Sequence, residues 1–172
     1  VSAQATPFPE PSSEDPAVYP HPTYSISPSR PQRARQAVYW CLLLLLCSAY
    51  LQGGIGKALD FPAAVGEMRH FGLAPAAPLA LLTIVGELGA SLLVLSGVLR
   101  WAGALYLGLF TFGANLVANR FWLLEGSART MAENGFFEHL GLVGAFLIVA
   151  LVDLGGAKAV QAVGAAASSA RQ

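Results

Sequence analysis

One ionisable side chain, Glu87, lies in the middle of a long apolar run, residues 79–99. On a helix it falls about 12 Å from the start of that run, close to the centre of a bilayer. A charged group at this depth costs about 2.5 to 3.5 kcal/mol on insertion scales, so it needs a partner or a task. Two roles fit. A protonated or hydrogen-bonded carboxyl would lock helices together, whereas a carboxyl facing an open site would handle protons or a ligand.

Further polar or small residues recur every four residues in three apolar segments, so each set shares one helix face. The sets are Ser48, Gln52 and Gly56; Thr83, Glu87 and Ser91; and Thr111, Asn115 and Asn119. Because three polar faces cannot all face lipid, we expect them to converge inside a helical bundle. The predicted intramembrane cluster is Gln52, Lys57, Thr83, Glu87, Asn115, Asn119 and His139, with Lys57, Arg120 and Glu138 at its mouth.

Composition identifies the class of protein that would hold such a cluster. Of the 172 residues, 55% are hydrophobic and 12% are charged, and the mean hydropathy is +0.55. A soluble domain carries about twice that charge, so the sequence predicts a membrane protein. The zero formal charge argues against nucleic-acid binding. Cys41 and Cys47 are six residues apart and point about 120° away from each other on a helix, so no redox pair, metal site or cofactor is indicated.

Four segments come close to the ~20 apolar residues that a spanning helix needs. They are residues 37–56, 79–99, 102–123 and 136–154. The predicted fold is therefore all-α, a four-helix transmembrane bundle over residues 37–154. Residues 155–172 are expected to form a short cytoplasmic tail, in which a small helix over residues 157–167 follows the membrane surface.

Residues 1–36 contain eight of the eleven prolines and no apolar periodicity. This composition predicts a disordered or extended arm, without the apolar stretch of a secretory signal peptide. Three arginines, Arg30, Arg33 and Arg35, precede the first span and place both termini in the cytoplasm by the positive-inside rule. We expect the arm to dock on a partner on the cytoplasmic side, because a proline-rich chain loses little entropy when it is fixed.

Several short motifs resemble those of the DoxX family of membrane proteins. They are Gly54-Ile-Gly-Lys57, the run from Glu87 to Gly97, Asn119-Arg-Phe-Trp122, and Asn134-Gly-Phe-Phe-Glu-His-Leu-Gly141. The resemblance extends over about residues 37–154. It implies a four-helix protein of the bacterial cytoplasmic (inner) membrane, with Lys57, Glu87 and the block from Asn119 to Trp122 as the positions that carry over. Where family members often have a histidine before the aromatic pair, this chain has Asn119.

The resemblance also implies a class of function. Namesake members are small subunits of thiosulfate:quinone oxidoreductase or of quinol-oxidising assemblies. The function predicted from the sequence is therefore an accessory subunit of a bacterial membrane redox complex, respiratory or quinone-linked, that packs against larger integral membrane subunits and lipids. On this view the chain has no enzymatic activity on its own, and a quinone or a lipid is its expected ligand.

Two alternatives use the same polar residues. In the first, the chain is a quinone-interacting oxidoreductase component, in which Glu87, Asn115 and His139 contact the quinone headgroup directly. His139 would donate to a carbonyl oxygen, and Glu87 would relay the proton. In the second, the polar faces form the pathway of a small transporter or channel. His139 also has a purely structural interpretation, as an interfacial residue that is hydrogen-bonded to a loop.

Overall fold

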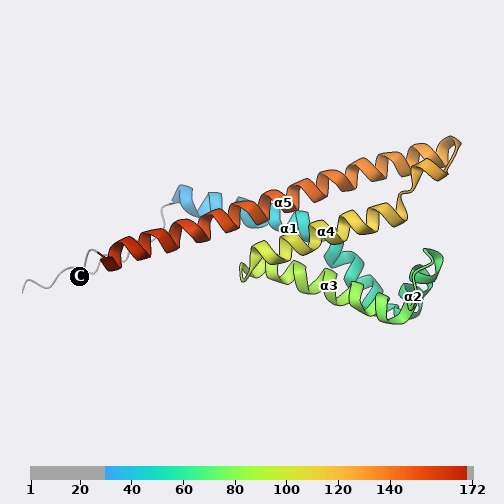
Figure 1. Ribbon diagram of the computed structural model, residues 1–172, viewed down its shortest axis with the longest axis horizontal. Helices are drawn as coiled ribbons and strands as arrows, with labels where there is room; N and C mark the ends of the chain where they lie inside the picture. The colour runs from blue at the N-terminus through green and yellow to red at the C-terminus, as the bar shows by residue number, and fades with distance from the viewer. Residues whose placement is uncertain (1–29, 170–172) are drawn as a thin grey trace, which may run out of the picture.

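A computed structural model describes residues 30–169, and every element in that range is a helix (Figure 1). Four helical segments are long and apolar enough to cross a membrane. They are α1 (Arg30–Leu59), α3 (Ala76–Ser96), α4 (Arg100–Ala118) with the short 3₁₀ helix η1 (Phe121–Leu123), and α5 (Gly126–Ser169). The predicted all-α fold with four spans is confirmed. Most of the proline-rich arm, residues 1–29, lies outside the described residues.

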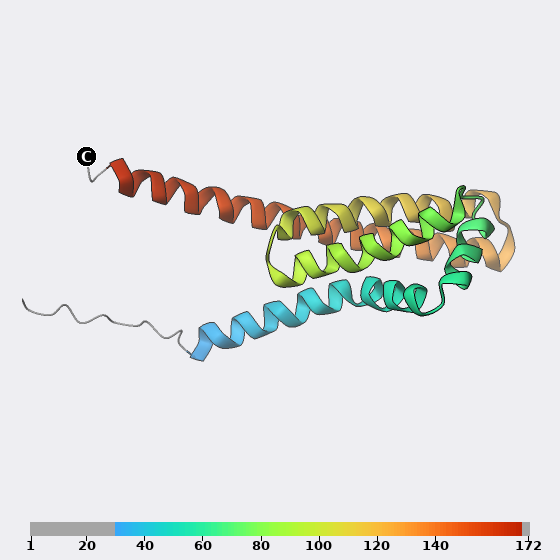
Figure 2. The ribbon, with the colours of Figure 1, turned by 90° about the horizontal axis from the view of Figure 1, so that it is seen from below.

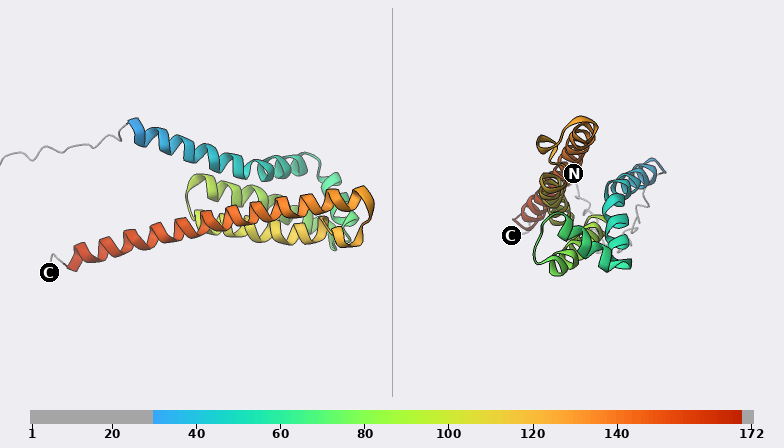
Figure 3. Two further views of the ribbon diagram at one scale, coloured as in Figure 1. Left: turned by 90° about the horizontal axis from the view of Figure 1, so that it is seen from above. Right: turned by 90° about the vertical axis from the view of Figure 1, so that its right-hand side faces the viewer.

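The long helices alternate in direction, and each packs against its neighbour along the chain. Figure 2 shows the start of α1 and the end of α5 at one end of the bundle and the short helix α2 (Phe61–His70) at the other. The left view in Figure 3 shows the start of α1 and the end of α5 diverging where they extend beyond α3 and α4. Both ends of the described chain therefore lie on the same side of the membrane, as an even number of spans requires.

A core of apolar side chains joins all four long helices in the half of the bundle nearest the chain ends. Its fully buried members include Cys47 of α1, Val94 of α3, Leu107 of α4 and Phe146 of α5. The helices approach closely there because Gly103 has no side chain. A Cβ at Gly103 would lie 2.7 Å from the Ala90 carbonyl oxygen. Small residues thus set the spacing of α3 and α4.

Arg100 connects the helices at the end of the bundle that is nearest the start of α1. Its Nε donates to the Val94 carbonyl at 2.9 Å, and its Nη1 lies 3.7 Å from the Asp153 carboxylate of α5. The guanidinium also lies 5.5 Å and 5.3 Å from the ring centroids of Tyr39 and Trp40 of α1, within the range of a cation–π contact. One side chain thus contacts α1, α3 and α5.

The helix boundaries differ most from the predicted ones at the start of α1 and at both ends of α5. The first helix begins at Arg30 rather than at residue 37. The fourth begins at Gly126 rather than at residue 136 and continues unbroken to Ser169. A separate small helix along the membrane surface over residues 157–167 was therefore a wrong prediction: Gly155 and Gly156 do not interrupt α5, which extends straight out of the bundle (Figure 1).

Helix α2 was not predicted at all. Its start is nevertheless encoded locally, because the Asp60 side chain accepts a hydrogen bond from the Ala63 N–H at 3.0 Å. Pro62 occupies a first-turn position, where its missing N–H costs nothing. Ala64 and Met68 then pack on Ala80 of α3. This contact holds α2 against α3 at the end of the bundle opposite the chain ends.

Candidate ligand-binding cavity

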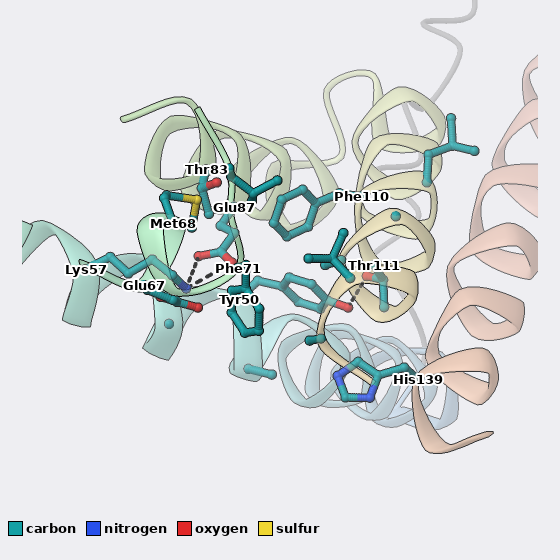
Figure 4. A pocket seen from close by; sticks show the side chains of 18 of the residues that line it. Tyr50, Lys57, Glu67, Met68, Phe71, Thr83, Glu87, Phe110, Thr111 and His139 are labelled. Carbon is teal, nitrogen blue, oxygen red and sulfur yellow. Dashed lines mark hydrogen bonds and ion pairs between the residues drawn. The ribbon is translucent and has the colours of Figure 1, made fainter. Parts of the chain in front are cut away.

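A cavity of about 520 Å³ lies in the half of the bundle nearest α2 (Figure 4). Helices α1 to α5 all contribute to its wall. Much of the space exists because small residues face it, among them Ala49, Gly53, Gly113 and Ala114. A Cβ at Gly113 would meet no atom within 4 Å. The cavity is thus formed by the absence of side chain volume on α1 and α4.

An ion pair between Lys57 of α1 and Glu87 of α3 forms the polar side of the cavity. The Lys57 Nζ lies 3.3 Å from Oε1 and 3.4 Å from Oε2 of Glu87. The two side chains are 18% and 8% exposed, so both charges are largely removed from solvent. Glu87 thus has the cationic partner that its depth demands. Lys57, predicted at the mouth of the cluster, instead contacts its most buried carboxylate.

Tyr50 and Thr111 form a hydrogen-bonded link between α1 and α4. The Thr111 hydroxyl donates its single proton to the Leu107 carbonyl, one turn earlier in α4. Tyr50 must therefore be the donor in its bond to Thr111. The Tyr50 oxygen keeps free lone pairs, and its ring packs edge-on against Phe146 of α5 at a centroid distance of 5.3 Å.

His139 lines the cavity from α5, and Figure 4 shows its ring directed toward the side where Tyr50 lies. Its Nδ1 lies 2.6 Å from the Gly135 carbonyl oxygen. Because a carbonyl can only accept, Nδ1 carries a proton and donates it within α5. In the neutral ring Nε2 is then an acceptor.

Two asparagines of the predicted cluster have a different role. Asn115 is 1% exposed and donates to the Phe136 carbonyl of α5 at 2.9 Å. Asn119 donates to the Asn115 side chain oxygen at 2.8 Å. Neither lines the cavity. They join α4 to α5 beside it, so their hydrogen bonds stabilise the bundle.

The polar face predicted for the interior side of α1 points outward. Gln52 and Ser48 are exposed, and Ser48 donates to the Leu45 carbonyl of its own helix at 2.7 Å. The inward face instead carries Leu43, Cys47 and Tyr50 and, one to two turns later, Lys57. A serine hydroxyl that donates to its own helix backbone is satisfied without an interior partner. The polarity of the side chains therefore did not indicate which face of α1 points inward. The expected rim residues Arg120 and Glu138 are exposed and do not line the cavity.

Of the predicted cluster, the structure brings together Lys57, Thr83, Glu87 and His139 and leaves out Gln52, Asn115 and Asn119. Sequence reasoning did not assign Tyr50 or the contributions of α2 to the cavity. Met68 and Glu67 of α2 and the adjacent Phe71 complete the wall. Glu67 therefore lines the same cavity as Glu87. The signal for α2 was the Asp60 cap with Pro62 beside it.

Metal-binding side chains do not cluster in the part of the chain that is described: no three His, Cys, Asp or Glu residues come together there. The two cysteines are free, with Cys47 buried in the core and Cys41 exposed on α1.

Comparison with known proteins relates part of this bundle to a family. The DoxX family model matches residues 41–120, which include most of α1 and all of α2, α3 and α4. The matched segment contains the Lys57–Glu87 pair and most of the cavity wall. No curated protein and no solved structure gives a significant match. Residues 41–120 of this four-span membrane protein therefore belong to the DoxX family.

Proposed function

We propose that this chain is a quinone-binding accessory subunit of a bacterial membrane redox complex. The observation that carries the proposal is the cavity between the spanning helices, which joins a charged, hydrogen-bonding side to apolar walls. Its volume of about 520 Å³ is within the usual range of small-molecule sites. A ligand that reaches it from the lipid must combine a polar ring with an apolar tail, as membrane quinones do.

The lining residues fit the two parts of such a molecule. The polar headgroup would lie near Lys57, Glu87 and Thr83, where oxygen atoms find charged and hydroxyl partners. The apolar tail would follow Val117 and Leu142, which line the α4 and α5 walls. A bound quinone would supply two-electron redox chemistry, while the chain would bind and orient it. Electron transfer itself would belong to partner subunits.

The match of residues 41–120 to the DoxX family supports a role in membrane redox chemistry. The partners we propose are larger integral membrane subunits in the inner membrane, with both termini of this chain in the cytoplasm. The basic residues Arg33, Arg35 and Arg100 lie at that end of the bundle, which supports this orientation. The proline-rich arm would then reach a partner on the same side.

The geometry gives little support to a small transporter or channel. Such a protein needs a polar path through the whole membrane, but the half of the bundle beyond the cavity is filled by the apolar core. The polar face of α1 that would have continued the path points outward. The cavity therefore ends inside the bundle, as suits a binding site.

Binding of a short-chain ubiquinone analogue, decylubiquinone, tests the proposal. The purified chain is placed in phospholipid nanodiscs, and partition of the radiolabelled analogue is compared with empty nanodiscs. Gly113→Leu adds a side chain into open space in the cavity, and we expect it to weaken binding at least tenfold. Gly144→Leu is the matched control, because Gly144 also has open space beside it but does not line the cavity. Equal partition in wild type, Gly113→Leu and empty nanodiscs would reject the proposal.

A further inference from the structure

The hydrogen-bonding groups of the cavity can be sorted into donors and acceptors from the bonds they already make. Tyr50 has its proton committed to Thr111 and offers only lone pairs. His139 has its Nδ1 proton committed to Gly135, so the neutral ring offers only the Nε2 lone pair. Both groups are therefore acceptors toward a ligand.

The carboxylates of the cavity wall add further hydrogen-bond acceptors. Glu87 is an acceptor at both oxygens, and a carboxylate oxygen that accepts one bond from Lys57 can accept another. Glu67 lines the same cavity with a further carboxylate. Among the described residues that line the cavity, Lys57 is the only charged donor, and its ammonium is already paired with both oxygens of Glu87. Thr83 can donate or accept.

The oxidised and reduced forms of a quinone differ in whether their ring oxygens can donate hydrogen bonds. The oxidised ring carries two carbonyl oxygens and offers no donor, whereas the reduced ring carries two hydroxyl groups that each donate a proton. The cavity offers at most two donors to the oxidised form, the Lys57 ammonium, which is already paired with Glu87, and the Thr83 hydroxyl. It can satisfy both hydroxyls of the reduced form, and an acceptor left unpaired inside the bilayer is costly.

We propose that the cavity selects the reduced, hydroxyl-bearing form of its ligand, with one ring hydroxyl donating to Nε2 of His139 and the other to a carboxylate oxygen of Glu87. The inference rests on the proposed function, because it assigns the redox state of the ligand at the same site. It reverses the role that the sequence suggested for His139, which acts as an acceptor here. The assignment concerns binding alone, and no electron or proton is transferred within the chain.

The test compares the affinities of decylubiquinol and decylubiquinone for the protein in phospholipid nanodiscs, with the quinol kept reduced under anaerobic conditions. We expect the quinol to bind about tenfold more tightly, which corresponds to about 1.4 kcal/mol. The bound couple should show a midpoint potential raised by roughly 30 mV over that in empty nanodiscs, since a tenfold preference in a two-electron couple has this size.

The variant His139→Leu removes the acceptor and loses only a bond within α5. It should reduce quinol affinity to the level of the quinone and leave quinone affinity unchanged, which also shows that the cavity remains intact. Gln52→Leu is the control, because Gln52 is a polar residue on the outer surface of α1. It should preserve the preference.

The outcomes separate the two proposals. Equal affinity for both forms in the wild type, or a preference that His139→Leu leaves in place, would overturn the selection of the reduced form while the binding site stands. An equal loss of both affinities in His139→Leu would also overturn it, because His139 would then not discriminate between the forms. Failure of both forms to bind the wild type would reject the proposed function itself.

Discussion

The Glu87 carboxylate is stabilised between apolar helices by its ion pair with Lys57. The Lys57 ammonium lies against both of its oxygens, and the carboxylate side chain is 8% exposed. Taking two charges out of water is costly, and their attraction repays this cost only while both are present. The pair therefore behaves as a unit, and its two members should be substituted together.

This interdependence predicts the outcome of a double-mutant cycle. Lys57→Met alone leaves an unpaired buried carboxylate, and we expect it to lower the free energy of unfolding by about 3 kcal/mol. Lys57→Met combined with Glu87→Gln removes both charges and should be closer to wild type. Reversible unfolding in mixed detergent and dodecyl sulfate micelles, followed by circular dichroism, measures the difference. If the effects of the two single substitutions simply add, the residues do not interact.

The residue scale also shows where sequence reasoning succeeds. Glu87 stands out in the sequence because an acidic residue in an apolar run is rare and has few structural uses, and in the structure it lines the cavity. Gln52 was assigned wrongly because polarity alone was taken to indicate the inward face of α1. Tyr50 was missed for the opposite reason. A tyrosine in an apolar run looks like a packing residue, and its hydrogen bond to Thr111 joins positions 61 residues apart, which no local pattern encodes.

Among the elements, α3 and α4 are held closest by Gly103. A methyl group there would lie 2.7 Å from the Ala90 carbonyl oxygen and 2.9 Å from the Leu93 Cβ, and neither atom belongs to the end of a flexible side chain. The two helices would have to separate. Gly113, ten residues later on α4, has open space in place of these contacts.

We therefore expect Gly103→Ala and Gly113→Ala to have opposite effects. Gly103→Ala should destabilise the bundle by about 1 to 3 kcal/mol through overpacking. Gly113→Ala should be neutral or slightly stabilising, because alanine favours a helix over glycine by up to about 1 kcal/mol. The thermal unfolding midpoint of the two purified variants in detergent provides the comparison. Equal midpoints would mean that α3 and α4 can separate at no cost.

The elements were predictable to different degrees. Four spans follow from hydropathy alone, because each apolar run has the length that the membrane requires. Helix α2 does not, since residues 60–75 contain two prolines, two glycines and several charges that resemble a loop. Its stability comes from Ala64 and Met68 packing on α3, a tertiary contact that composition does not reveal. The cavity wall depends on α2 and was therefore incomplete at the sequence level.

For the whole molecule, the arrangement predicts which segments are reached from each side of the membrane. We expect both chain ends and the α3–α4 turn to be cytoplasmic and α2 to lie on the opposite side. In a chain whose Cys41 and Cys47 are replaced by serine and alanine, Gly66→Cys on α2 and Ser168→Cys near the end of α5 supply single thiols. Gly66 has open space beside it and Ser168 is exposed.

A membrane-impermeant maleimide should label the Gly66→Cys thiol in intact cells and the Ser168→Cys thiol only in inverted membrane vesicles. Labelling of Gly66→Cys in inverted vesicles alone would reverse the proposed orientation while leaving the four-span bundle unchanged. Labelling of both thiols from one side would contradict the even number of spans.

The unbroken length of α5 gives the molecule a mechanical property. Its 44 residues measure roughly 66 Å, about twice the hydrocarbon thickness of a bilayer. His139 lies about 20 Å from the start of the helix, and Ser169 is about 45 Å further along the same axis. A tilt of about 10° around His139 would displace the far end by about 8 Å. The helix therefore acts as a lever that converts a small tilt at the cavity into a larger displacement outside the membrane. A spectroscopic label near its C-terminal end would report this displacement.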